Sequence, residues 1–274
     1  MKNIAKKILV VLMAVLLIGA MAACAPAADS NAKTVSLGTS ADYPPFEFIY
    51  LDDQGAQQDA GIDVSLANKL AADMGAELNV VNMNFDSLMA SLEKGDVDFV
   101  IAAVEVTEER LQSADFSDPY YTDLPAMILV KADKAAEYTS LESFAGKSVG
   151  AQSGTTKADI VNNEMPGAKF VGLTSVIDLV NELMYDKCDA IVLDGAVALD
   201  YAASNSELVV ADVALGEALP FCVAVQKGDP KGLLPGINEA IAKINSENKI
   251  EEFIALADSL SGVAEEVSAD APAE

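Results

Sequence analysis

A single arginine in the segment 97–121 could bind a carboxylate. Arg110 is the only arginine of the chain, whose other sixteen basic residues are lysines. Its guanidinium is planar and offers a fork of N–H donors that matches a carboxylate, which the ammonium of lysine cannot reproduce. A solvated helix arginine is the commoner role of this residue type. The position one turn after an apolar run, Val97 to Ala103, favours a binding role.

Two further positions have residue types suited to charged groups. The segment 152–156, Gln-Ser-Gly-Thr-Thr, follows a predicted strand and opens a predicted helix. Free backbone N–H groups at such a turn favour an anion, although any capped helix shows the same pattern. Asp194 ends the predicted strand 189–193, at the sheet edge that faces the crevice in α/β proteins, so it could meet a cation. The alternative is that Asp194 caps a helix over 195–203.

Strand and helix patterns alternate along the chain and predict the fold class. Short apolar runs at 77–81, 147–151 and 189–193 alternate with helical patterns such as 61–74 and 85–94. This alternation predicts an α/β fold of mainly parallel sheets covered by helices. It does not by itself divide the chain into lobes.

The order of motifs around Arg110 resembles that of the extracellular solute-binding proteins of ABC transporters, in the amino-acid-binding family 3. A strand, a small-residue turn, a T-x-E-R-like helix start and a D-F-S-x-P-Y run follow in this order within residues 97–121. The resemblance covers roughly residues 34–257. It implies a two-lobed periplasmic-binding-protein-like fold (type II), in which each lobe is a mainly parallel sheet flanked by helices.

The resemblance also implies the division into lobes and the function. One lobe would comprise residues 34–121 plus 221–260 and the other 122–220, joined by a two-strand hinge. A small amino acid or amino-acid derivative would lie between the lobes, and hinge closure would bury it before delivery to an ABC permease. The resemblance implies no catalytic residue, no metal and no cofactor, and we expect a monomer.

Individual residues receive roles from the same resemblance. Arg110 would clamp the carboxylate of the ligand. The backbone at Ala103 and Thr155, or the hydroxyl of Thr156, would assist it. Asp194 would bind the α-ammonium of the ligand.

Aromatic side chains would flank the side chain of the ligand. Tyr43 follows a predicted strand and precedes Pro44-Pro45, which stiffen the loop that carries it. Its ring would stack on the ligand. Phe85 starts a predicted helix and would form a second wall of the pocket, or it would belong to the core face of that helix.

Glu105 departs from the family pattern, which usually has a serine or threonine there whose hydroxyl contacts the carboxylate. A carboxylate at this position would repel the ligand unless it turned away or paired with Arg110. With Asp42 and Asp194 in reach, Glu105 points to a basic ligand such as arginine or lysine, or to a ligand that is not a standard amino acid. The enzymatic alternative is a cyclohexadienyl-dehydratase-like activity on the same fold, with Glu105 as general acid or base. A ligand-sensing lipoprotein is a further alternative.

Composition excludes several classes. The chain has no histidine, so catalytic sets that need one and histidine-ligated metals are excluded. The formal charge of −26 disfavours nucleic acid and anionic lipid surfaces as partners. Cys188 and Cys222 stand beside apolar runs, and we expect two buried free thiols.

Both ends of the chain are predicted to lie outside the folded part. Residues 1–23 have the basic start and apolar run of a signal peptide. Small residues before Cys24 resemble a lipobox, although Met21 replaces the usual leucine. We therefore expect a lipid anchor on Cys24, a tether over 24–33 and an extracytoplasmic location at a bacterial membrane, a plain secretory signal being the alternative. The acidic, alanine-rich segment 261–274 is predicted to be a disordered tail.

Overall fold

The computed structural model describes residues 33–269, and the chain from Thr34 onward forms one compact unit. The predicted signal peptide, Cys24 and the tether up to residue 32 lie outside the described residues, as do residues 270–274. Between Lys33 and Ala269, no helix has both the length and the apolar character needed to cross a membrane.

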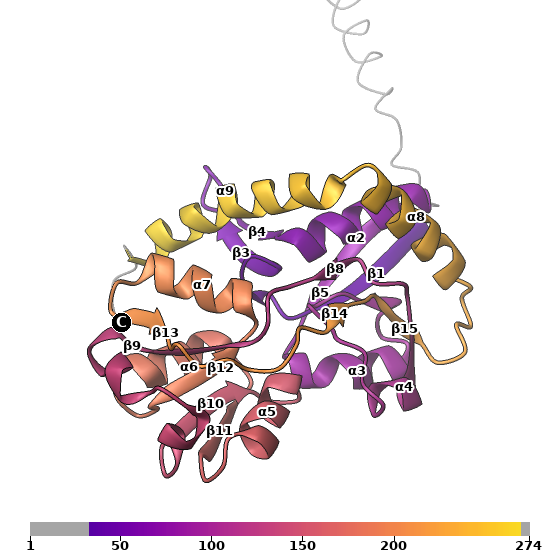
Figure 1. Cartoon of the computed structure of the whole chain (residues 1–274). Helices are drawn as coiled ribbons and strands as arrows, with labels where there is room; N and C mark the ends of the chain where they lie inside the picture. Colours follow the sequence, from indigo (N-terminus) through magenta and orange to yellow (C-terminus); the bar gives the residue numbers. More distant parts are fainter. Residues whose placement is uncertain (1–32, 270–274) are drawn as a thin grey trace, which may run out of the picture. The chain divides into compact units, whose positions relative to one another are not determined.

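Two five-stranded sheets form the framework of this unit (Figure 1). The first sheet has the order β5 (Ala76–Asn82), β1 (Lys33–Thr39), β6 (Phe99–Val100), β15 (Ala224–Gln226) and β7 (Ala114–Phe116). The second has the order β11 (Lys169–Leu173), β10 (Ser148–Gln152), β12 (Ala190–Leu193), β9 (Met127–Lys131) and β13 (Leu208–Val210). A separate three-stranded sheet contains β2 (Asp42–Tyr43), β3 (Glu47–Leu51) and β4 (Gln57–Ala60).

Each large sheet is mixed, whereas the alternation of elements predicted mainly parallel sheets. Strand β1 is parallel to β6, and β10 is parallel to both β11 and β12. Strand β15 is antiparallel to β6 and β7, and β9 is antiparallel to β12 and β13. Parallel neighbours need a long crossover connection. Strands β9 and β15 need no such crossover connection, because the chain reaches each of them directly from the other sheet.

The chain passes between the two sheets through a two-stranded ribbon. Strand β8 (Tyr121–Thr122) pairs antiparallel with β14 (Pro220–Phe221). Glu105 forms an isolated antiparallel bridge with Phe221, so one candidate site residue lies beside the crossing. The ribbon corresponds to the two-strand hinge of the predicted fold class. The predicted sequence limits of the lobes stay a prediction.

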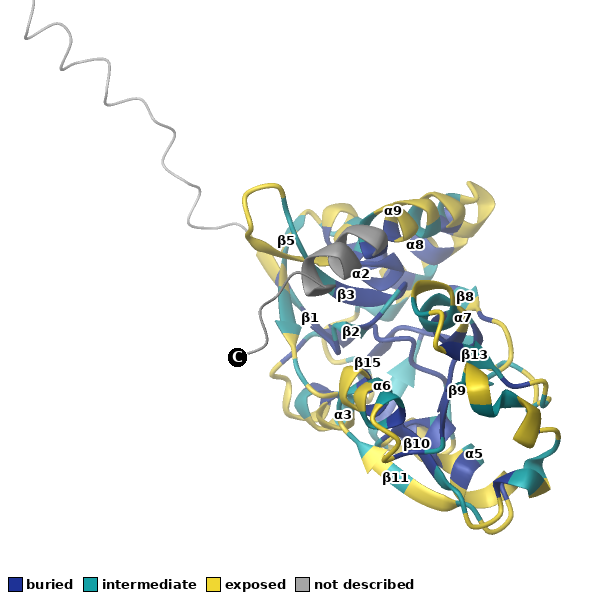
Figure 2. Ribbon diagram, turned by 90° about the vertical axis from the view of Figure 1, so that its left-hand side faces the viewer, coloured by how far each residue is buried: buried dark blue, intermediate teal, exposed yellow. Residues whose placement is uncertain are grey.

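Helices cover the sheets, as the α/β prediction requires (Figure 1). The first lobe carries α2 (Ile62–Asp73), α3 (Phe85–Lys94), α4 (Arg110–Ser113), α8 (Leu234–Ser246) and α9 (Lys249–Ala269). The second lobe carries α5 (Thr156–Glu164), α6 (Val176–Met184), α7 (Gly195–Ser204) and the 3₁₀ helices η1 (Ala132–Glu137) and η2 (Leu141–Phe144). The central strands are buried, and the outward faces of the helices are exposed (Figure 2).

The C-terminal helix reaches into the segment 261–274, for which a disordered tail is predicted, and that prediction stays a prediction. Helix α9 packs against β3 and α2 and continues through Ala269 (Figure 1). Within this part of the helix, Ala264, Glu265, Glu266 and Ala269 are residue types of high helix propensity, which favours continuation of a helix that packing has already started.

Both cysteines of the described chain are buried free thiols, which confirms the prediction for them. Cys188 lies beside the second sheet and Cys222 follows β14. Burial raises the pKa of each thiol to about 11.

Candidate functional site

Arg110 joins the two lobes through its guanidinium. It is the first residue of α4, and its backbone N–H donates to the hydroxyl of Thr107 at 3.2 Å. Its Nη1 donates to the carbonyl of Glu105 at 2.7 Å, and its Nη2 donates to the carbonyl of Gly154, on the other lobe, at 3.0 Å. The guanidinium carbon lies 5.3 Å from the ring centre of Phe85. Arg110 is therefore a buried cation whose orientation is fixed from two sides and by an aromatic face.

The turn that precedes α5 brings backbone groups to this guanidinium. Gly154 has a φ of +79°, a conformation that glycine adopts without the penalty that a Cβ would bring. Thr155 is the N-cap: its hydroxyl accepts the N–H of Ala158 at 3.3 Å and donates to the carbonyl of Gln152 at 2.7 Å. The predicted helix start is thus present. Its Thr155 hydroxyl holds the turn in shape.

Glu105 faces a cation that the sequence had not indicated. Its carboxylate accepts a hydrogen bond from the hydroxyl of Thr156, and its Oε1 lies 3.1 Å from the Nζ of Lys157. Both donors come from the first turn of α5, on the opposite lobe. Glu105 accepts a hydrogen bond from Arg110 through its backbone carbonyl, and its carboxylate turns to Thr156 and Lys157, which is the first of the two alternatives given above.

Asp194 lies at the other end of the same cluster. Its Oδ1 is 2.7 Å from the Nζ of Lys157, and its Oδ2 accepts from the hydroxyl of Tyr43 at 2.8 Å. The Tyr43 hydroxyl also accepts the backbone N–H of Asp194 at 2.9 Å. Asp194 is the N-cap residue of α7, but its side chain forms no capping hydrogen bond. The carboxylate therefore points into the space between the lobes.

Burial and mutual charge set the electrostatics of this cluster. Burial acts to lower the pKa of Lys157, but the carboxylates of Asp194 and Glu105 outweigh it, and the pKa is raised. Burial raises the pKa of Asp194 in spite of the opposing effect of Lys157. Burial also lowers the pKa of Arg110 from a value so high that the guanidinium stays charged. The site thus holds two buried ion pairs and one separate buried cation.

Two buried carboxyl groups, those of Asp63 and Glu47, lie behind the turn at Ala103. This residue has a φ of +45°, and its N–H donates to Asp63 at 2.7 Å. The other oxygen of Asp63 accepts from the hydroxyl of Tyr120 at 2.7 Å. Burial raises the pKa of Asp63 to about 6, and burial together with Asp63 raises the pKa of Glu47 well above its ordinary range. The Ala103 N–H is therefore engaged within the chain, and its expected help to a ligand carboxylate stays a prediction.

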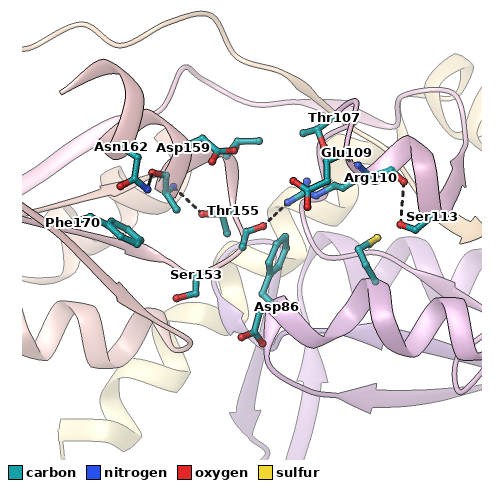
Figure 3. A pocket seen from close by; sticks show the side chains of 15 residues that line it. Asp86, Thr107, Glu109, Arg110, Ser113, Ser153, Thr155, Asp159, Asn162 and Phe170 are labelled. Atoms are coloured by element: carbon teal, nitrogen blue, oxygen red, sulfur yellow. Dashed lines mark hydrogen bonds between the residues drawn. The ribbon is translucent and has the colours of Figure 1, made fainter. Parts of the chain in front are cut away.

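Two cavities of the crevice between the lobes share Phe85 and Thr155. The larger, of about 430 Å³, has Arg110 and Thr107 on one side and Asp159 and Phe170 on the other (Figure 3). The smaller, of about 10 Å³, lies in the ion-pair cluster. Its lining comprises Tyr43, Glu47, Phe85, Ala102, Ala103, Glu105, Gln152, Thr155, Lys157 and Asp194.

The structure brings the sequence-predicted site residues to this one crevice. Tyr43, Phe85, Ala103, Glu105, Thr155 and Asp194 line the smaller cavity, and Arg110 and Thr156 line the larger one. Their roles toward a ligand stay predictions. Asp42, expected near the ligand, accepts the N–H of Val176 at 2.9 Å and so joins the first lobe to the start of α6.

Sequence reasoning missed Lys157, Glu47 and Asp63. Lys157 follows directly after two candidate residues, and this adjacency was the signal that could have found it. Asp63 lies in the first turn of α2, where an acidic residue is common, but its side chain binds Ala103 and Tyr120. Glu47 gave no signal beyond its place after Phe46 in a short strand.

Comparison with known proteins agrees with this architecture. The model of bacterial extracellular solute-binding proteins, family 3, matches residues 35–255. The arginine-binding extracellular protein ArtP of Bacillus subtilis is 34% identical over 256 residues, which cover 90% of this chain and 96% of that protein. ABC transporter arginine-binding protein 1 of Escherichia coli is 31% identical over 228 residues, which cover 82% and 90%. The crystal structure of the amino acid ABC transporter substrate-binding protein AbpA of Streptococcus pneumoniae, bound to L-arginine, has a TM-score of 0.79 and 30% identity, and the match covers 83% of this chain and 95% of that chain.

The two sheets, the ribbon that joins them and the crevice between them define a two-lobed protein of the type II periplasmic-binding class. The chain belongs to the bacterial extracellular solute-binding proteins of family 3. This membership confirms the family predicted from residues 97–121 and places the protein outside the cytoplasm.

Proposed function

We propose that this protein captures a cationic amino acid, with L-arginine as the first candidate, and delivers it to the permease of an ABC transporter. The ligand carboxylate would bind Arg110 and its α-ammonium would bind Asp194. Tyr43 and Phe85 would flank its side chain. The observation that carries the choice of a cationic ligand is the excess of acidic side chains around the crevice.

The two cavities are lined by two basic side chains, Arg110 and Lys157, and by five acidic side chains when Glu47 is not counted. Glu47 is omitted because its raised pKa favours the neutral acid. The α-ammonium and α-carboxylate of a bound amino acid cancel in charge. A positive side chain would therefore offset part of the remaining negative charge, and a neutral one would not. The five acids are Asp86, Glu105, Glu109, Asp159 and Asp194.

The relatives support arginine among the cationic amino acids. ArtP and ABC transporter arginine-binding protein 1 are named for arginine, and AbpA was crystallised with it. Glu105, the departure from the family pattern, need not repel a ligand carboxylate in this chain, because Lys157 and Thr156 lie against its own carboxylate.

Capture would couple binding to closure of the hinge. The polar contacts between the lobes include Arg110 with Gly154, Tyr43 with Asp194, and Glu105 with the start of α5. A ligand held by Arg110 and Asp194 would add contacts to both lobes and so favour the closed arrangement. The permease would recognise that arrangement. We further propose that the protein acts as a monomer, that a lipid on Cys24 anchors it to the membrane, and that it releases its ligand chemically unchanged.

A thermal-shift screen tests the proposal. The chain from residue 25 to 274 is melted with each of the twenty amino acids, with ornithine and with citrulline. A ligand that binds only the folded state raises the melting temperature by mass action. We expect a rise with arginine and a smaller one with lysine and ornithine, all of them lost in Arg110→Met. A rise with neutral or acidic amino acids alone would contradict the proposal. In a separate incubation with prephenate or arogenate, formation of product would favour the enzymatic alternative.

A further inference from the structure

Lys157 carries an ammonium group into the position where the ligand would place its own. Its Nζ lies 2.7 Å from Asp194 and 3.1 Å from Glu105, and the residue is 5% exposed. The second oxygen of Asp194 is taken by the Tyr43 hydroxyl at 2.8 Å. Both oxygens of the proposed ammonium receptor are thus hydrogen-bonded by the chain itself.

Lys157 has a second carboxylate within reach, which distinguishes it from a simple blocking group. Its partner Glu105 is on the other lobe, and Thr156 donates to the same carboxylate. If a ligand ammonium takes Asp194, Lys157 keeps Glu105 and no buried charge is left unpaired. Such an unpaired buried charge would be costly, so the presence of two carboxylates makes the exchange feasible.

We propose that Lys157 is a specificity-determining residue that acts as an internal competitor for Asp194: the ligand binds by replacing one ammonium with another. This inference rests on the proposed function. Because the exchange at Asp194 trades one ion pair for a similar one, the α-ammonium adds little net affinity. The side chain and carboxylate of the ligand must therefore supply most of the binding free energy. Lys157 would thereby exclude small amino acids, which have little else to offer.

The contribution of the ligand ammonium can be measured directly. L-arginine and deaminoarginine, in which hydrogen replaces the α-ammonium, are titrated calorimetrically into the wild type, Lys157→Met and the control Lys169→Met. Lys169 is an exposed lysine of the same lobe. Any effect of leaving Glu105 without its cation acts on both ligands, since both carry the carboxylate. The ratio of the two dissociation constants therefore reports what the ligand ammonium contributes with and without Lys157.

We expect the preference for arginine over deaminoarginine to be small in the wild type and in Lys169→Met, and at least about tenfold larger in Lys157→Met. Lys157→Gln, which keeps a hydrogen-bond donor without the charge, should behave like Lys157→Met and serves if the latter does not fold. An unchanged or smaller preference in both variants would overturn the proposal.

A ligand-free measurement keeps this inference separate from the proposed function. If arginine binds none of the proteins, the proposed function fails, and small-angle X-ray scattering without ligand decides the role of Lys157. An ammonium that bridges Asp194 and Glu105 should hold the lobes together. The radius of gyration of Lys157→Met should then exceed that of the wild type and of Lys169→Met. Equal radii would overturn the internal bridge on which the competition depends.

Discussion

Replacement of Arg110 by methionine should weaken both binding and folding, because the guanidinium serves both. Methionine preserves much of the side-chain bulk and removes the charge and the donors. Truncating one partner of a buried, hydrogen-bonded charge pair costs about 2 to 5 kcal/mol in binding, so the affinity for arginine should fall by about 30-fold to several-thousand-fold. Isothermal titration calorimetry measures this loss.

The structure also gives the expected cost in stability. The substitution removes the guanidinium donors of two carbonyl groups, those of Glu105 at 2.7 Å and of Gly154 at 3.0 Å. A buried polar group left without a partner costs about 1 to 3 kcal/mol. The substitution also removes the cost of burying a charged guanidinium, which offsets part of this loss. We therefore expect the free energy of unfolding by urea to fall by about 2 kcal/mol.

Arg110→Lys is the matched control, because it keeps a positive charge. One ammonium cannot reproduce the fork toward a carboxylate, so binding should still fall by at least about tenfold, while stability should fall less than in Arg110→Met. A loss of arginine affinity smaller than about tenfold in Arg110→Met would refute the carboxylate role of Arg110.

Three further predictions concern other parts of the fold. Tyr43→Phe removes both hydrogen bonds between the phenol and Asp194, and at about 1 kcal/mol per bond the arginine affinity should fall by about 30-fold; an unchanged Kd would contradict it. Asp63 has a pKa raised to about 6, so the folded state binds more protons than the unfolded state between about pH 4 and 6, and this residue's contribution to stability falls as the pH rises through that window. The stability of the wild type relative to Asp63→Asn should therefore decline by on the order of 3 kcal/mol across the window, and a difference independent of pH would contradict this. In the protein from residue 25 onward, Cys188 and Cys222 should react with a thiol reagent only when the chain unfolds, since both are buried with a pKa raised to about 11; rapid labelling of the native protein would refute this.

The sequence predicted the fold class and family well, because the motifs around Arg110 are local. A strand, a turn and a helix start within residues 97–121 can be recognised without knowledge of their neighbours in space. The mixed character of the sheets could not be recognised in this way. It depends on how β9 and β15 enter their sheets after the crossing ribbon, which no local pattern reports.

The partners of the site residues were also beyond local reasoning. A lysine in the first turn of a helix is ordinarily solvated, and the local signal for Lys157 is limited to its place directly after the candidate residues Thr155 and Thr156. Its partners Glu105 and Asp194 lie 52 and 37 residues away, on different lobes. Asp194 shows the same limit: a helix cap and an ion-pair partner have the same local sequence, and only the position of Lys157 separates them.

The composition of the segment 261–274 does not separate a disordered tail from a continued helix. Acidity and alanine content are typical of disordered segments, but alanine and glutamate also sustain a helix once packing has begun one, and α9 runs through Ala269.

Calorimetric titration of the wild-type chain with L-arginine and with L-citrulline tests the central claim most directly. Citrulline has nearly the shape of arginine, with a neutral urea group in place of the guanidinium. If the acidic crevice selects a cationic amino acid, arginine should bind with one site per chain and citrulline at least about a hundredfold more weakly, a difference of about 2.7 kcal/mol. Equal binding of the two, or no heat with arginine, would contradict the claim.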